Sequence, residues 1–93
     1  MNAPALTLAV FSDAALEYCQ VFSGSVTSWY RTVDHNAEVG GHPRSAHLVG
    51  LAVDVVYDGS RPGPQADAWL ALHGLKRLVE GDHDHLMPTH WGG

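Results

Sequence analysis

The sequence predicts one small α+β domain in which two helices accompany a mostly antiparallel sheet of about four strands. The chain has 93 residues, which suffice for a single domain over residues 1–93 and leave no room for a second. Two segments have the apolar spacing of helices, and four short segments rich in β-branched, aromatic or alternating apolar residues are bounded by turn residues. These two observations together favour a sheet packed with helices over an all-helical fold.

The two predicted helices are separated by two of the four predicted strands. We expect the first over residues 12–22, with Ser12 as its N-cap and Gly24 just past its end. We expect the second over residues 65–73, where Gly74 stops it.

Two predicted strands lie between these helices and two follow the second helix. They are residues 26–31, 51–57, 75–79 and 82–87. A tight turn at Glu80-Gly81 should join the last two strands into a hairpin. A polar stretch over residues 32–45 separates the first two strands, and connections of this length in a small domain are usually functional or disordered.

Charge and composition exclude several classes of partner and site. Ten acidic residues against five basic ones give a formal charge of −5, so the chain lacks the basic face that nucleic acid requires. Cys19 is the sole cysteine, which excludes an internal disulfide and a cysteine-rich zinc finger. The longest apolar runs are too short for a membrane span. No basic residue precedes the first apolar stretch, so we expect no signal peptide and synthesis in the cytoplasm.

Asp54 lies in the middle of the apolar strand predicted over residues 51–57. An isolated buried carboxylate is costly, and buried charges are normally paired or bound to metal. Candidate partners are His47, seven residues earlier, and His83 and His85, which share one face of a strand. Two imidazoles and one carboxylate are typical of a catalytic zinc site, which lowers the pKa of bound water to ~7. The alternative is that Asp54 pairs with an arginine while the histidines lie on the surface.

Residues 45–54, Ser-Ala-His-Leu-Val-Gly-Leu-Ala-Val-Asp, fit the pattern S-x-H-x-x-G-x-A-x-D at every fixed position. This motif resembles that of the zinc D-Ala-D-Ala carboxypeptidase family, which shares its fold with the hedgehog signalling domain. The chain upstream of the motif is also similar to the segment that precedes it in that family, at Ser28-Trp29-Tyr30-Arg31, Asn36 and Gly40-Gly41. Downstream, residues 82–86 resemble its closing H-x-H segment. The similarity extends from about Val26 to Leu86, and it implies a hedgehog-like or D-Ala-D-Ala-peptidase-like fold.

The resemblance also implies roles for particular residues. His47, Asp54 and His85 match the positions that bind Zn²⁺ in the family. Arg31 matches an arginine that holds the carbonyl or carboxylate of the substrate and could stabilise an oxyanion. Ser45 is expected to bind substrate or to orient the loop of His47.

The general base remains open among three residues. Asp82 lies three positions before the closing histidine, where some members of the family carry an acid. His83 is the first of the closing pair, which other members place near the catalytic water, and Glu80 is a third contender. Strand alternation favours His83, because it shares a face with His85 whereas Asp82 points away.

The expected function is therefore that of a zinc metallopeptidase acting on stem peptides of bacterial peptidoglycan. Within the family this means a D-Ala-D-Ala carboxypeptidase or an L-Ala-D-Glu endopeptidase, and the small size and missing signal peptide favour a phage or prophage endolysin that acts on the cell wall. The alternative is an inactive, zinc-stabilised binding or structural module, as the hedgehog relatives illustrate. The sequence leaves open which bond is cut and whether the chain is a monomer or a weak homodimer.

Overall fold

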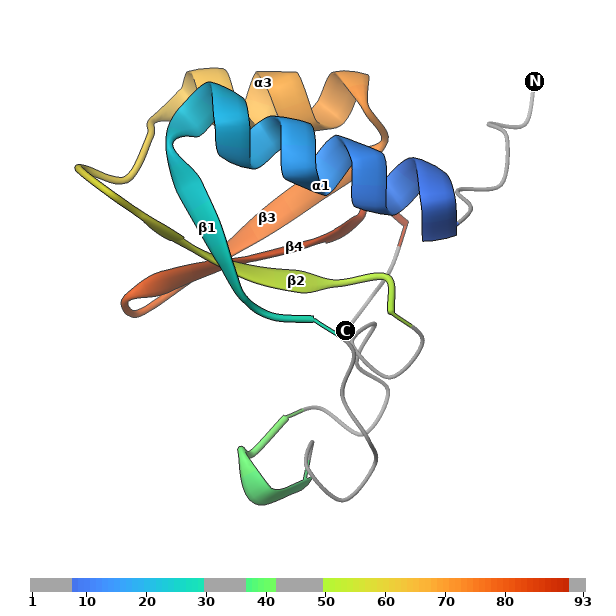
Figure 1. Cartoon of the computed structure of the whole chain (residues 1–93), viewed down its shortest axis with the longest axis vertical. Coiled ribbons are helices and arrows are strands. Elements are labelled where there is room, and N and C mark those ends of the chain that lie inside the picture. Colours follow the sequence, from blue (N-terminus) through green and yellow to red (C-terminus); the bar gives the residue numbers. More distant parts are fainter. Residues whose placement is uncertain (1–7, 30–36, 42–49, 91–93) are drawn as a thin grey trace.

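The computed structural model describes residues 8–29, 37–41 and 50–90. The elements are α1 (Leu8–Phe22), β1 (Gly24–Ser28), β2 (Val53–Tyr57), α3 (Pro64–Leu72), β3 (Leu75–Glu80) and β4 (His83–Pro88) (Figure 1). The strands form one sheet in the order β1-β2-β4-β3, and each neighbouring pair is antiparallel. The predicted α+β fold class, with two helices and a four-stranded antiparallel sheet, is confirmed.

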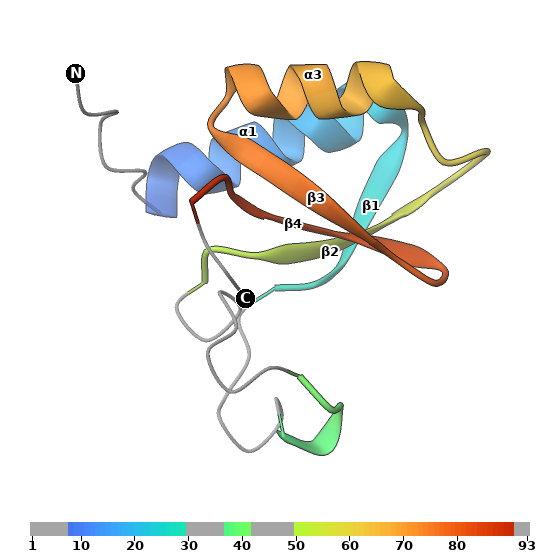
Figure 2. The same cartoon turned by 180° about the vertical axis from the view of Figure 1, so that it is seen from behind.

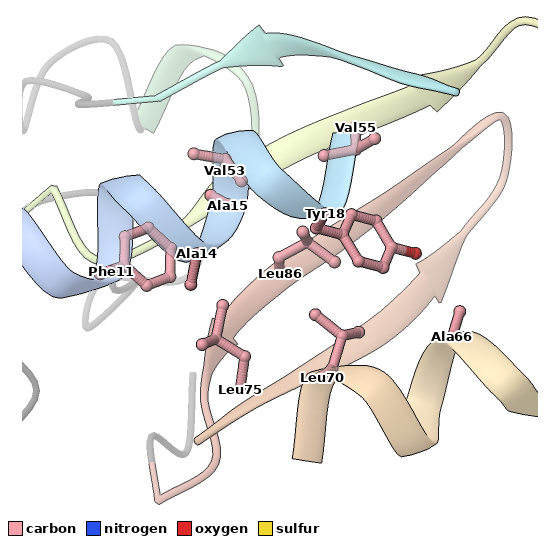
Figure 3. Packing of buried hydrophobic residues seen from close by; sticks show 10 residues of the cluster. All are labelled: Phe11, Ala14, Ala15, Tyr18, Val53, Val55, Ala66, Leu70, Leu75 and Leu86. Atoms are coloured by element: carbon pink, nitrogen blue, oxygen red, sulfur yellow. The ribbon is translucent and has the colours of Figure 1, made fainter. Parts of the chain in front are cut away.

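Both helices pack on the same face of the sheet, as the two opposite views show (Figures 1 and 2). The core between these layers contains Phe11, Ala14, Ala15, Tyr18, Val53, Val55, Ala66, Leu70, Leu75 and Leu86 (Figure 3). Because side chains alternate along a strand, Asp54 and His85 point to the face opposite the helices. One sheet face therefore provides the core, and the other is available for polar groups.

Helix α1 begins at Leu8, four residues before the predicted start. Ser12 lies inside the helix, where its hydroxyl donates a hydrogen bond to the carbonyl of Ala9 (3.0 Å), so the prediction that it is the N-cap is wrong. The physical reason is a tertiary contact: the fully buried ring of Phe11 packs edge-on against Trp29, at 6.3 Å between centroids. This burial stabilises helical backbone upstream of the serine.

The end of α1 at Phe22 agrees with the prediction, but Gly24 does not provide the stop. Ser23 takes the left-handed conformation instead (φ 54°), and Gly24 is already the first residue of β1. A Cβ at Gly24 would lie 2.7 Å from Cγ1 of Val55. The glycine is therefore required by the close approach of β1 to β2.

Strand β1 begins two residues before its predicted start and ends three residues before its predicted end, and residues 30 and 31 of that prediction lie outside the described residues. The elements from β2 onward differ from the predictions by one or two residues at their ends. The hairpin shows the most consequential difference, because Glu80 pairs with His83 and the turn is Gly81-Asp82, one residue later than predicted. Glu80 thereby becomes a strand residue. No helix within the described ranges is long and apolar enough to cross a membrane.

Candidate active site

Asp54 and His85 are direct partners across the β2–β4 pair. Nδ1 of His85 lies 3.1 Å from Oδ1 of Asp54, and the two side chains are only 8% and 13% exposed. A buried carboxylate needs a polar or charged partner, and this imidazole supplies one. Of the three histidines that the sequence offered as partners of Asp54, His85 therefore contacts it directly.

Glu80 and His83 complete a cluster on the same sheet face. Ligand atoms of Asp54, Glu80 and His83 all lie within 4.8 Å of one another. Oε1 of Glu80 is 3.6 Å from Nε2 of His83 and 3.9 Å from Nδ1 of His85. Imidazole nitrogens and carboxylate oxygens are the donors that zinc takes in catalytic sites. The donor set of this cluster therefore fits a zinc ion.

His83 stands between two acids. Its Nδ1 lies 3.0 Å from Oδ1 of Asp82, whose side chain is 97% exposed. This hydrogen bond is the main cause that raises the pKa of His83, and the negative charges of Asp54 and Glu80 act in the same direction. The same contact lowers the pKa of Asp82. Asp82 is thus placed to orient the imidazole of His83 toward the cluster.

A second acidic residue, Asp84, lies between the two histidines of β4 and points into the helix-covered side of the sheet. It is fully buried, and its Oδ2 accepts hydrogen bonds from the hydroxyl of Tyr57 (2.7 Å) and from Nη1 of Arg77 (2.9 Å). Nε of Arg61 lies 2.8 Å from Oδ1. Sequence reasoning missed this residue, because its neighbours His83 and His85 are polar and, unlike the apolar neighbours of Asp54, do not indicate a buried strand.

Three predicted site residues, Arg31, Ser45 and His47, lie outside the described residues. Trp29 and Gly50, which precede and follow these residues in the chain, are described. Nε1 of Trp29 donates a hydrogen bond to the carbonyl of Gly50 (3.0 Å). Gly50 has φ 74°, a left-handed conformation that explains why this position of the motif is a glycine. The roles assigned to the three residues stay predictions.

A family model described as Peptidase M15 matches residues 5–84. The match covers most of the chain and confirms the resemblance that the motifs indicated. It includes Asp54, Glu80 and His83 and ends just before His85. No curated protein and no solved structure matches the chain.

Proposed function

We propose that this chain, which belongs to the Peptidase M15 family, is a zinc metallopeptidase that hydrolyses stem peptides of bacterial peptidoglycan. The observation that carries the proposal is the cluster of Asp54, Glu80 and His83 on the sheet face opposite the helices, with His85 against Asp54. Its imidazoles and carboxylates are the ligands and proton acceptors that hydrolysis of an amide requires.

We assign the metal to Asp54 and His85, together with His47 from outside the described residues. The contact between Asp54 and His85 supports this assignment, because it brings two of the three donors together. Bound zinc would polarise the scissile carbonyl and lower the pKa of a water molecule in the site. The competing set is Asp54, Glu80 and His83, which shares Asp54 with the first.

The general base in this proposal is Nε2 of His83. When Nδ1 of His83 carries its proton toward Asp82, Nε2 is left as an acceptor that faces Glu80 and the cluster. This nitrogen would take the proton of the attacking water and return it to the leaving amine. Asp82 fixes the tautomer of His83 through the hydrogen bond at Nδ1. Glu80 is the competing candidate for the general base. Arg31 would stabilise the negative charge that develops on the carbonyl oxygen.

The test is digestion of purified peptidoglycan by the zinc-loaded protein and by His83→Ala and Asp82→Ala variants. New amine termini should appear with the wild type, be nearly lost in His83→Ala and be reduced in Asp82→Ala. Mass spectrometry of the fragments then distinguishes cleavage between the two D-Ala residues from cleavage between L-Ala and D-Glu. If the wild type binds one zinc ion per chain but releases no amine, the chain is instead a zinc-stabilised binding module.

A further inference from the structure

Arg61 contacts the β3–β4 hairpin, which carries Glu80, His83 and His85, from outside the cluster. It lies between β2 and α3, in the connection over residues 58–63. Its Nη2 donates to the carbonyl of Gly81 (2.9 Å) and to that of His83 (3.1 Å). One guanidinium nitrogen therefore bridges two backbone positions on either side of Asp82.

The same guanidinium is held from the core side. Nε of Arg61 lies 2.8 Å from Oδ1 of the fully buried Asp84, and Oδ2 of Asp84 is held in turn by Arg77 and Tyr57. Arg77 also donates to the carboxylate of Asp67 at the start of α3. A planar, always charged group with several fixed donors is suited to such a bridge, whereas a flexible point charge is not.

This bridge matters because β3 is an edge strand, and its end next to the turn is exposed at Val79 and Glu80. Strand ends with exposed backbone hydrogen bonds and few buried contacts open locally at low free-energy cost. Catalytic groups need supporting contacts that hold them close to the productive geometry. Arg61 provides such support through its hydrogen bonds to the carbonyls of Gly81 and His83.

We infer that Arg61 is a positioning residue, which fixes the backbone of His83 and so holds its imidazole beside Asp54 and Glu80. The inference rests on the peptidase function proposed above. Arg61 itself touches neither the cluster side chains nor a substrate in this account; it acts through two carbonyls of the hairpin. Its removal should therefore loosen the hairpin and slow the reaction while the rest of the fold is retained.

The test compares Arg61→Gln with Asp67→Asn, a control that weakens the far end of the same network without releasing the hairpin carbonyls. Amide hydrogen exchange by NMR should accelerate about tenfold in residues 80–85 of Arg61→Gln and stay unchanged in α1. On solubilised stem peptides, kcat should fall about tenfold with KM within about twofold of the wild type. Asp67→Asn should leave hairpin exchange and kcat within about twofold of the wild type.

Three results would overturn the inference: hairpin exchange unchanged in Arg61→Gln, acceleration spread equally over the whole chain, or an equal loss of kcat in Asp67→Asn. If Arg61→Gln does not fold, Arg61→Lys replaces it, because lysine keeps the positive charge beside Asp84. The same changes in hairpin exchange and in kcat are then expected. If the wild type cleaves no stem peptide, the proposed function fails, while the exchange data and the imidazole NMR signals of His83 still decide whether Arg61 positions this residue.

Discussion

His85 and Asp54 face each other across two central strands, with 3.1 Å between imidazole Nδ1 and carboxylate Oδ1. Both side chains are mostly buried, so the pair lies at the floor of the cluster rather than at its rim. Glu80 and His83 are more exposed and lie on the hairpin side. We therefore place metal binding at the floor and proton transfer at the rim.

Removal of the metal should destabilise the protein. A ligand that binds only the native state stabilises it by about 2.7 kcal/mol at a concentration 100 times its Kd. For a domain of this size, each kcal/mol shifts Tm by about 4–8 °C. A chelator should therefore lower the Tm measured by circular dichroism by about 10 °C or more, and added zinc should restore it. Equal Tm values with and without chelator would show that no bound metal ion stabilises the folded protein.

Single substitutions should separate the two possible ligand sets. In our assignment, His85→Ala loses zinc affinity by about 100-fold or more, because one of three protein ligands is removed. His83→Ala should bind zinc within a few-fold of the wild type but lose activity. Competition with a chromogenic chelator measures both affinities. The reverse pattern, with zinc lost in His83→Ala and Glu80→Gln but kept in His85→Ala, would assign the metal to Asp54, Glu80 and His83.

Removal of Asp84 should be strongly destabilising. In Asp84→Leu the guanidinium of Arg77, whose side chain is only 6% exposed, loses a buried partner. Breaking a buried ion pair on one side costs about 3–5 kcal/mol. Urea denaturation measures the free energy of unfolding, and Asp67→Asn serves as the exposed control, with an expected loss of about 0–1 kcal/mol. A loss in Asp84→Leu no larger than that of the control would contradict the network described above.

Two tyrosines should make the fold sensitive to alkali. Burial is the main cause that raises the pKa of both Tyr57 and Tyr18, whose hydroxyls are 2.6 Å apart. Above about pH 10 the unfolded chain releases these protons while the folded chain keeps them, so the free energy of unfolding must fall as pH rises. Tyr57→Phe should show a shallower fall between pH 9.5 and about 11.5. The measurement is urea denaturation at several pH values, combined with tyrosinate absorbance at 295 nm. Full ionisation of all three tyrosines in the folded protein near pH 10 would refute this prediction.

Part of the site could be predicted from strand alternation. An acid inside an apolar strand requires a partner, and alternation places His83 and His85 on one face, so both were candidates beside Asp54, as was His47. The choice of His85 among these histidines came from the resemblance of residues 82–86 to the closing segment of the family. The turn is predicted one residue too early, at Glu80-Gly81, so the prediction leaves Glu80 outside the strand and misses its place beside Asp54 and His83. Its place opposite His83 depends on the hairpin register, and local residue preferences determine register only within a residue or so.

Other features depend on tertiary contacts that no local pattern encodes. The early start of α1 follows from the burial of Phe11 against Trp29, which outweighs the capping preference of Ser12. The network of Asp84 joins residues from β2, β3, β4 and the connection before α3. Neither the burial of Asp84 nor the identity of its partners follows from a local sequence pattern.

The most direct test of the proposed zinc site is the zinc content of the purified, metal-replete protein and of the Asp54→Asn variant. Inductively coupled plasma mass spectrometry measures this content. Asp54 belongs to both possible ligand sets, so the result does not depend on which of them is correct. We expect one zinc ion per chain in the wild type and a large loss in Asp54→Asn, with folding retained. A wild type that binds no zinc, or an Asp54→Asn variant that keeps it fully, would contradict the proposed metal site.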